Sequence, residues 1–422
     1  MNPSDSTFHL LCAALRPVRD GAAWARLRGA DAEAWPPVVD LAVQHGLVPV
    51  LYVAVKGQAA DLGIPPDGLE RMNEIYLTAV ACHLRLFRAL TGVLAAYEQQ
   101  AIPAALLKGA HLASEIYPAP GLRTMGDVDL LLHERDLPRA ERCLLDMGAE
   151  PNDACRIVTD GTQHFGYAFR DSGLVVENHW TLKAAVRQQI DLEALWARTR
   201  EATRFPGARL LGPDDLLLHV CLHAAHDLHG LLLRAIYDAT LVVDREAGAL
   251  DWPGLCARAR EWRVSRAVTG ILRIARDGLG AEVPDAALAM LDPDDAATDR
   301  VEAMKRLLMD GSAGAARARN ADVTGSVAQL WAQPGGWAKV RFAWRRLMST
   351  PREMQRMYNA PAGAWGRLGY YPRRIADLFR RHGQAAWRML RRDPQARALA
   401  ARKQEAARLQ QWLFEKREEG EG

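Results

Sequence analysis

The sequence predicts an α+β protein, in which one small sheet is embedded in a mostly helical chain of 422 residues. Two observations indicate this class. Good helix formers (Ala, Leu and Arg) are abundant, and apolar residues recur at three- and four-residue spacing over most of the chain. Runs typical of strands gather between residues 102 and 180. Because the chain is longer than one hydrophobic core usually supports, we expect two or three structural units.

Residues 1–100 are predicted to form a helical N-terminal unit. Segments such as WPPVVDLAVQHGLVPVLYVAVKG and MNEIYLTAVACHLRLFRALTGVLAAYEQQ carry apolar residues at helical spacing. Residues 101–210 are predicted to form the core unit that holds the sheet, because the runs AALL, DVDLLL, HFGYAFR and LVVENHW alternate there with helical stretches. Two of these runs flank Asp171-Ser172-Gly173, a polar connection typical of a hairpin, so we expect the last two strands to be antiparallel.

The helical pattern returns after Pro213, and residues 211–311 are predicted to form a helical domain. Residues 312–336 are rich in small residues and Gly and are predicted to be a linker or loop. Residues 337–422 are predicted to be a basic, aromatic-rich helical tail. We see no internal repeat in the chain.

The N-terminal sequence has no basic region before its short apolar stretch, so we expect no signal peptide. No uninterrupted apolar run reaches about 18 residues, so we also expect no transmembrane segment. The six cysteines have no paired spacing, which favours a reducing compartment over a disulfide framework. These features predict a cytoplasmic protein.

Two aspartates lie at the start of the predicted strand DVDLLL. Val128 and Leu130 share one parity and would face the core, whereas Asp127 and Asp129 share the other face. Their Cα atoms would be roughly 7 Å apart, given about 3.3 Å of rise per residue. Carboxylates that point the same way from a strand end suit Mg²⁺, and two such ions about 4 Å apart would hold a triphosphate, activate a hydroxyl and neutralise the leaving oxygen.

Glu177 is the acidic residue inside the strand that the hairpin brings near these aspartates. It is therefore predicted to be the third carboxylate, either as a metal ligand or as the general base. His179 follows two residues later on the same face and is a candidate for a position behind the ligands or for acceptor contact.

Lys108, Gly109 and Arg123 precede the aspartates in the chain and are predicted to bind the nucleotide. Lys108-Gly109 ends a strand and precedes a helix expected from about residue 110 to residue 117, whose free amides could receive phosphate oxygens. Arg123 is a further candidate phosphate contact. Each signal is weak alone, and it is their order and spacing that favour phosphate chemistry.

With these motifs, the sequence resembles the uncharacterised nucleotidyltransferase family of bacteria, within the DNA polymerase β-like nucleotidyltransferase superfamily. The similar segments are LLKGAHLASEIYP, LRTMGDVDLLLHERDLPRAERCLLDMGAE, VVENHWTL and LLLHVCLHAAHDLHGLLLRAIYDATLVV, and the resemblance covers roughly residues 8–280. It implies a nucleotidyltransferase-fold mixed sheet, dependence on a divalent metal and use of a nucleoside triphosphate. Asp127 and Asp129 match the paired metal-binding aspartates of that superfamily. The chain departs from its usual Gly-Ser turn, because Ala110 and His111 follow Gly109.

The same resemblance places His223 and Asp238 in a helical domain that flanks the cleft, where they could touch the nucleotide or the acceptor, or pair with each other. Histidines at 219, 223, 226 and 229 recur at helical spacing, which invites a zinc hypothesis. We disfavour zinc at these four histidines because no Cys or carboxylate is arranged to complete a tetrahedral site.

The tail differs in charge from the rest of the chain. From Trp331 onward it has 20 Lys or Arg against 8 Asp or Glu, a net +12, whereas the whole chain is +3. The segment WAKVRFAWRRLM and the segment YYPRRIADLFRRHGQAAWRMLRR each carry apolar residues on one helical face. The tail is expected to contact something acidic: the body of the protein, a membrane surface, or an acidic partner or nucleic acid.

Together these features predict a Mg²⁺-dependent nucleotidyltransferase that moves AMP from ATP, or another nucleoside monophosphate, onto a hydroxyl-bearing acceptor. A small molecule, a peptide or protein side chain and an RNA end all remain open as that acceptor. The alternative is a nucleotide-binding regulatory protein with the same fold and little transfer activity.

Overall fold

A computed structural model describes residues 3–18, 20–152, 164–182, 190–228, 231–292, 297–309, 336–337, 340–341, 344, 372, 375–376 and 394–414. The chain divides into two compact units, and each is considered by itself. The first comprises residues 1–227, 231–314 and 413–422, and the second comprises residues 228–230 and 315–412. Of the predicted linker at 312–336, all but Gly336 lies outside the described residues.

The N-terminal helices of the first unit confirm the predicted helical start. They are α1 (Pro3–Leu15), α2 (Gly21–Arg28), α3 (Trp35–His45), α4 (Val48–Val55) and α5 (Pro66–Gln99), with 3₁₀ turns η1 (Ala32–Ala34) and η2 (Lys56–Gln58). Local chemistry sets their ends. The Asp20 side chain accepts a hydrogen bond from the Ala23 amide at the start of α2. Gly46, in the left-handed conformation at φ 66°, ends α3.

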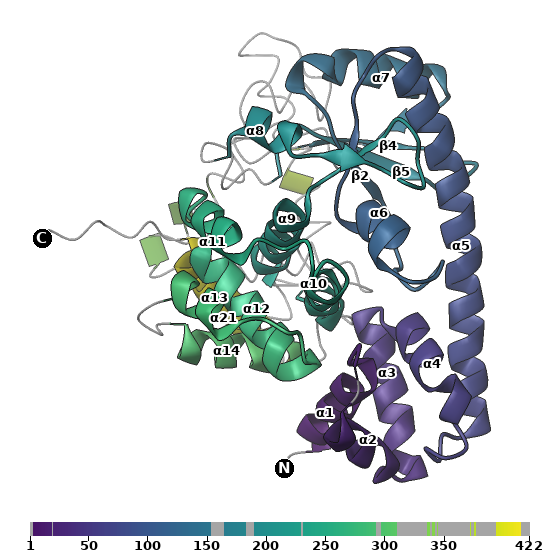
Figure 1. The fold of residues 1–422 in the computed structure, drawn as a ribbon, viewed down its shortest axis with the longest axis vertical. Helices are drawn as coiled ribbons and strands as arrows, with labels where there is room; N and C mark the ends of the chain where they lie inside the picture. Colours follow the sequence, from purple (N-terminus) through teal and green to yellow (C-terminus); the bar gives the residue numbers. More distant parts are fainter. Residues whose placement is uncertain are drawn as a thin grey trace, which may run out of the picture. The chain divides into compact units, whose positions relative to one another are not determined.

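Helix α5, 34 residues long, runs from the N-terminal helices to the sheet (Figure 1). Leu86, Leu90, Val93, Leu94 and Tyr97 form an apolar face on its second half and pack into the core of the sheet domain. By length and hydropathy α5 is also the one described helix that could cross a membrane, which sequence analysis did not anticipate, and a third of that window is buried inside the protein. The part of α5 that packs in the core of the sheet is one face of its second half.

One mixed sheet of seven strands forms the centre of the first unit, as the resemblance implied. Its strands are β1 (Ala105–Leu106), β2 (Val128–Leu131), β3 (Glu150–Pro151), β4 (His164–Ala168), β5 (Val175–His179), β6 (Arg200–Glu201) and β7 (Arg209–Leu210). Their spatial order is β3-β4-β5-β2-β1-β7-β6. The pairs β2–β5 and β1–β7 are parallel and the others antiparallel. The predicted antiparallel hairpin is confirmed as β4–β5.

Short helices connect these strands: α6 (Lys108–His111), the π-helix η3 (Leu112–Ile116), the 3₁₀ turn η4 (Glu134–Asp136), α7 (Leu137–Asp146) and α8 (Leu192–Ala197). The predicted single helix after the first strand is thus a short α-helix that widens into a π-helix. Because π-helices are rare and gather at functional sites, this segment is notable.

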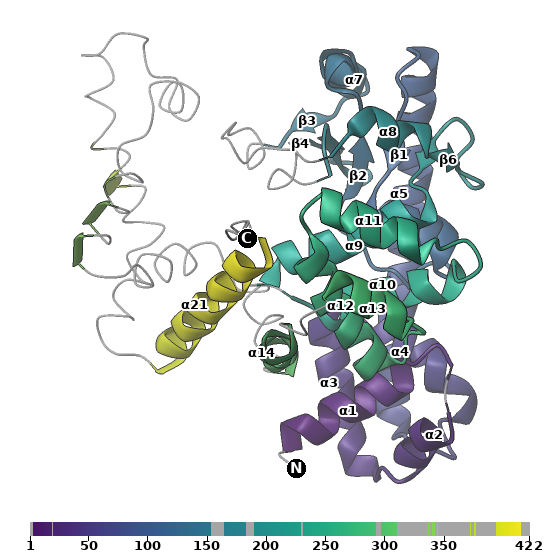
Figure 2. The ribbon, with the colours of Figure 1, turned by 60° about the vertical axis from the view of Figure 1, so that its left-hand side comes forward.

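A second helical layer follows the sheet in the sequence and consists of α9 (Pro213–His226), α10 (Leu233–Arg245), α11 (Trp252–Glu261), α12 (Ser265–Leu279), α13 (Asp285–Leu291) and α14 (Thr298–Met309). Helix α9 contacts α6, and α10 contacts η3, while α12 contacts α1. Figure 2 shows this layer between the N-terminal helices and the sheet. The predicted helical domain therefore packs against α6 and η3, the segment that follows β1.

The second unit includes most of helix α21 (Pro394–Phe414), and most of the predicted apolar stripes of the tail lie outside the described residues. Of the stripe residues that are described, Trp337, Val340, Trp344 and Ile375 are exposed within the chain.

Candidate active site

The carboxylates predicted from strand alternation lie where β2 begins. Asp127 directly precedes the strand and Asp129 is its second residue. Val128 and Leu130 point to the opposite face and are fully buried in the core. This anchored alternation fixes the direction of both aspartates, because a shift of one residue would exchange the two faces.

Glu177 reaches the same place from the neighbouring strand. In the parallel pair β2–β5, Glu177 lies opposite Asp129. One carboxylate oxygen from each of Asp127, Asp129 and Glu177 lies within 4.8 Å of the others. The structure therefore gathers all three predicted acids on one face of the sheet.

Lys108 provides a positive charge beside these acids. Its Nζ donates to Asp129 Oδ1 over 2.5 Å. The Lys108 backbone is in the left-handed region, at φ 33°, which costs a non-Gly residue about 1–3 kcal/mol. Such strain persists where the surrounding structure requires a particular side-chain direction, and here it accompanies the contact with Asp129.

The charges of the cluster are unevenly compensated. Burial alone would raise the pKa of Asp129, but Lys108 and His179 more than offset this and hold it well below its usual range. Burial and the nearby Asp129 carboxylate instead raise the pKa of Asp127. Asp127 forms no ion pair with any described residue. A bound cation would supply the missing charge.

Two histidines border the acids. His179 Nε2 lies 2.7 Å from Asp129 Oδ1 and is almost fully buried, which fits the predicted position behind the carboxylates. His164, on β4, lies opposite His179 in the antiparallel pair β4–β5. Its Nε2 is 3.4 Å from Glu177 Oε2, and burial together with the charge of His179 lowers its pKa. Sequence analysis missed His164, although counting outward from the predicted hairpin turn reaches it.

Gly109 is buried where the chain leaves β1 and enters α6. A Cβ at this position would lie 3.2 Å from Cγ and Sδ of Met125, closer than ordinary contact. The small size of Gly109 therefore allows the loop before β2 to pack against α6, and its predicted role at a phosphate stays a prediction.

The structure gives Arg123 a role different from the predicted phosphate contact. Its Nε and Nη2 donate to the two carboxylate oxygens of Asp238 on α10, both over 2.8 Å. The Tyr117 hydroxyl donates to the same carboxylate over 2.7 Å, and Arg123 Nη1 donates to the Thr124 carbonyl. All three side chains are buried. Arg123 is thus held in a buried ion pair that ties the loop before β2 to the helical layer, and its predicted phosphate contact stays a prediction.

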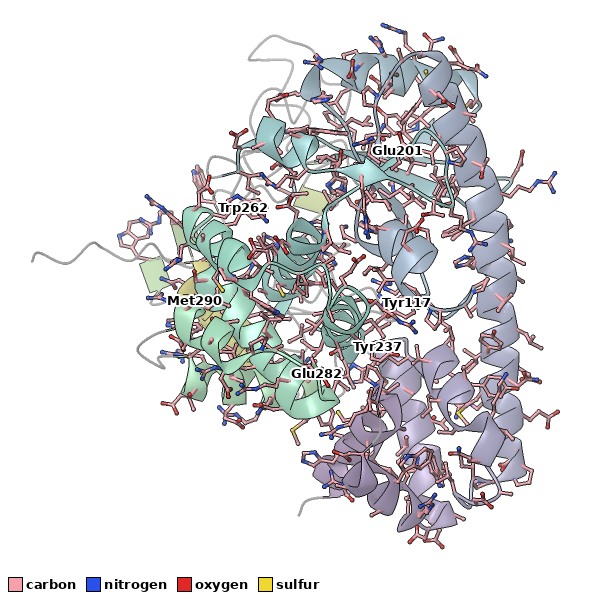
Figure 3. All side chains as sticks on the ribbon, in the orientation of Figure 1. Tyr117, Glu201, Tyr237, Trp262, Glu282 and Met290 are labelled. Carbon is pink, nitrogen blue, oxygen red and sulfur yellow. The ribbon has the colours of Figure 1, made fainter. Side chains whose placement is uncertain are left out.

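Asp238 is engaged in that same pair, and its predicted role at the nucleotide or acceptor stays a prediction. Figure 3 marks the region with Tyr117 and Tyr237, whose rings meet edge to face with centroids 5.9 Å apart. His223 lies half-buried on α9 with His219 and His226, and His229 is outside the described residues. The predicted role of His223 at the acceptor stays a prediction.

The mixed sheet presents three carboxylates from the parallel strands β2 and β5, with Lys108 of the segment after β1 beside them, as in a protein of the nucleotidyltransferase class. The chain belongs to the family described as uncharacterised nucleotidyltransferase, whose model matches residues 31–280. No curated protein and no solved structure matches the chain. Membership of this family makes the protein an enzyme of nucleotidyl transfer, and the resemblance seen in the sequence is confirmed over residues 31–280.

Proposed function

We propose that the protein is a Mg²⁺-dependent enzyme that transfers AMP from ATP onto a hydroxyl group of its acceptor. The observation that carries this proposal is the convergence of Asp127, Asp129 and Glu177, each of which offers one oxygen within 4.8 Å of the others. Mg²⁺ prefers oxygen ligands and commonly binds one or two carboxylates together with substrate phosphates. The donor set fits this ion.

When bound, Mg²⁺ would neutralise phosphate charge and acidify the attacking hydroxyl. The residues of the chain supply the remaining functions. Lys108 places an ammonium beside the carboxylates, and the triphosphate is the anion proposed to bind near it. Glu177, at the edge of the cluster, is proposed either to hold the metal or to accept the proton of the acceptor hydroxyl.

The acceptor is a small molecule, a protein side chain or an RNA end. We further propose a cytoplasmic location, which the five cysteines found free among the described residues support. The basic tail is proposed to bind an acidic partner or a membrane surface. Association of the full chain with anionic vesicles or nucleic acid that weakens as salt rises would support this, and no association at low salt would contradict it.

Calorimetry with each nucleoside triphosphate, with and without Mg²⁺, tests the first step. We expect tight binding of ATP that requires Mg²⁺. A pyrophosphate-release assay with candidate acceptors then tests transfer. A chain that binds no triphosphate in Mg²⁺, or binds ATP equally well in a chelator, would contradict the proposal. The double variant Asp127→Asn with Asp129→Asn keeps the side-chain shape and should lose the Mg²⁺-dependent part of binding.

A further inference from the structure

A second group of possible metal ligands overlaps the carboxylate cluster. His164, Glu177 and His179 each offer one ligand atom, and these atoms lie within 4.8 Å of one another. The sheet explains why they meet. His164 and His179 are opposite each other in the β4–β5 pair, and Glu177 is two residues before His179, so all three side chains leave the same face.

We propose that His164, His179 and Glu177 form a binding site for a transition-metal divalent cation such as Zn²⁺ or Mn²⁺, distinct from the Mg²⁺ position at Asp127 and Asp129. This inference goes beyond the proposed function and would stand even if the chain transferred no nucleotide. Glu177 belongs to both donor sets, so an ion at the histidines would compete with Mg²⁺ for this residue.

The distances from both histidines to Glu177 match those between ligands of one ion. The Nε2 atoms of His164 and His179 lie 3.4 Å and 3.5 Å from the same oxygen of Glu177. These separations exceed the usual 2.7–3.2 Å of an N–H···O hydrogen bond. Ligand atoms about 2.1 Å from one ion at tetrahedral angles are about 3.4 Å apart. Each histidine nitrogen thus lies at the separation from the Glu177 oxygen that two ligands of one ion would have.

The chemistry of the donors selects the kind of ion. Two imidazole nitrogens and one carboxylate oxygen suit Zn²⁺, Mn²⁺ or Fe²⁺, whereas an all-oxygen set suits Mg²⁺. The rings are held close, with centroids 4.7 Å apart, so little rearrangement is needed. Each Nδ1 is buried and makes no hydrogen bond with a described residue, and it is Nε2 of each ring that lies beside Glu177.

His179 also lies 2.7 Å from Asp129, which couples the two sites. In the metal-free chain Nε2 of His179 can donate to Asp129, and a transition metal would take that nitrogen and one Glu177 oxygen together. Binding at the histidines therefore removes Glu177 and the His179 contact from the carboxylate cluster. We expect micromolar Zn²⁺ to inhibit Mg²⁺-dependent transfer.

Metal binding is tested without nucleotide, on the full chain freed of any histidine tag. The chain is titrated with Zn²⁺ by calorimetry and with Co²⁺ by visible absorption. We expect one site that shows d–d bands of a low-coordinate Co²⁺ with nitrogen ligands, displaced by Zn²⁺. The variant His164→Gln should lose affinity on the order of 100-fold or more, because even residues behind a ligand contribute 10- to 100-fold.

Two matched variants separate this site from its neighbours. His9→Gln removes an exposed histidine from α1 and should leave Zn²⁺ binding unchanged. Asp127→Asn should weaken Mg²⁺–ATP binding yet keep Zn²⁺ binding.

Equal Zn²⁺ affinity in the parent and His164→Gln would overturn the proposal, as would equal losses of Zn²⁺ affinity in His164→Gln and Asp127→Asn. If His164→Gln fails to fold, X-ray absorption of the parent with Zn²⁺ decides, and a first shell without nitrogen overturns the site. Failure of the proposed function would appear separately, as absent Mg²⁺–ATP binding in a chain that still binds Zn²⁺.

Discussion

Asp129 on the sheet and Asp238 on α10 are almost equally buried, at 3% and 4% exposure, yet their surroundings differ. Asp238 has both oxygens matched by one guanidinium and receives a tyrosine hydroxyl as well. Asp129 belongs to a cluster of three carboxylates, and the ammonium that it contacts is the single one of Lys108. Burial of a charge therefore does not itself mark a functional site. Incomplete compensation of buried charge does, because it leaves a position for a cation from solution.

The two clusters should respond differently to mutation. In the cluster of Asp238, Arg123 and Tyr117, loss of one charge leaves the other buried and uncompensated, so stability suffers. In the carboxylate cluster, loss of one acid removes its repulsion from the other two carboxylates as well as its attraction to Lys108. We therefore expect catalytic activity to fall more than the stability of the fold. Each prediction below exploits this difference.

The largest expected effect is on catalysis. Asp129→Asn keeps the volume of the side chain and removes a charge that we propose holds the metal. Since metal ions supply several kcal/mol of transition-state stabilisation, we expect nucleotidyl transfer to fall by about 10³-fold or more. Pyrophosphate release under saturating ATP and Mg²⁺ measures this.

Asp146→Asn, at the end of α7, is the matched control and should keep the activity of the parent. Circular dichroism should show that the Asp129→Asn chain remains folded. Transfer by a folded Asp129→Asn chain at the rate of the parent would remove Asp129 from the proposed metal site.

The next effect is on stability. Asp238→Ala leaves the guanidinium of Arg123 buried without its partner, and we expect the free energy of unfolding to drop by about 3–5 kcal/mol. Tyr117→Phe removes one hydrogen bond to the same carboxylate and should cost only about 1 kcal/mol. Urea unfolding of each variant measures both.

The double variant Arg123→Met with Asp238→Leu replaces the pair by apolar side chains and should recover most of the lost stability. If Asp238→Ala unfolds no more easily than Tyr117→Phe, the ion pair is not what holds the loop before β2 to α10. A large loss of stability in Asp129→Asn, matching that of Asp238→Ala, would remove the contrast between the clusters.

These clusters also show how far sequence reasoning reaches. Strand parity, a local pattern, was enough to place Asp127 and Asp129 on one face. The hairpin signal identified the strand of Glu177, and the parallel pairing of β2 with β5 places Glu177 opposite Asp129. The partner of Arg123 is 115 residues away, and no local pattern announces it. From the sequence, the partner of Arg123 could be predicted only from its positive charge, which suits a phosphate and a buried carboxylate equally well.

The same limit applies to smaller features. His164 was reachable, because a hairpin turn sets the register and the register sets the opposite residue. The π-helix after α6 was not, because no local pattern in LASEI indicates its wider turn, and η3 packs against α10, which comes much later in the sequence. Local periodicity predicts elements and their faces, and long-range packing decides which charged groups are matched.

His111 is a buried basic residue that, unlike Asp129 and Asp238, has no side-chain hydrogen bond to a described residue. Its ring is fully buried on α6, and neither nitrogen bonds to a described residue. Burial, with a smaller contribution from Arg200, lowers its pKa to about 3. Below pH 6.5 the unfolded chain binds a proton that the folded chain does not bind until about pH 3. Stability should therefore fall as the pH drops between these values, by up to about 1.4 kcal/mol per pH unit from this residue.

His111→Leu removes the titrating ring, so the stability difference between parent and variant should acquire this slope between pH 6 and pH 4. Urea unfolding at several pH values measures it. Leu90→Val, a core substitution without a titrating group, should shift the curve without changing its slope. Parallel curves for the parent and His111→Leu would show that burial does not lower the pKa of His111 in the folded protein.

The smallest effect distinguishes two neighbouring acids. Burial and the Asp129 carboxylate raise the pKa of Asp127, so the folded metal-free chain disfavours its charge. Asp127→Asn should accordingly stabilise the metal-free chain at neutral pH, whereas Asp129→Asn should destabilise it, since the pKa of Asp129 is lowered. Asp127 is the most exposed of the three acids and solvent screens its charge, so the gain should be about 0.5 kcal/mol or less.

Two conditions reverse or erase this gain, and together they make the prediction decisive. As the pH falls below the folded pKa of Asp127 and then below its unfolded value, the carboxyl becomes neutral in both states and the advantage of Asn disappears. Added Mg²⁺ should stabilise the parent in proportion to the logarithm of its concentration above the Kd, and should do so much less for Asp127→Asn. Asp127→Asn should therefore be the more stable chain in chelator, and the parent should be the more stable chain in Mg²⁺. If Asp127→Asn is the less stable chain in chelator as well, the charge of Asp127 is already satisfied in the folded protein, and the cluster resembles the Arg123–Asp238 pair after all.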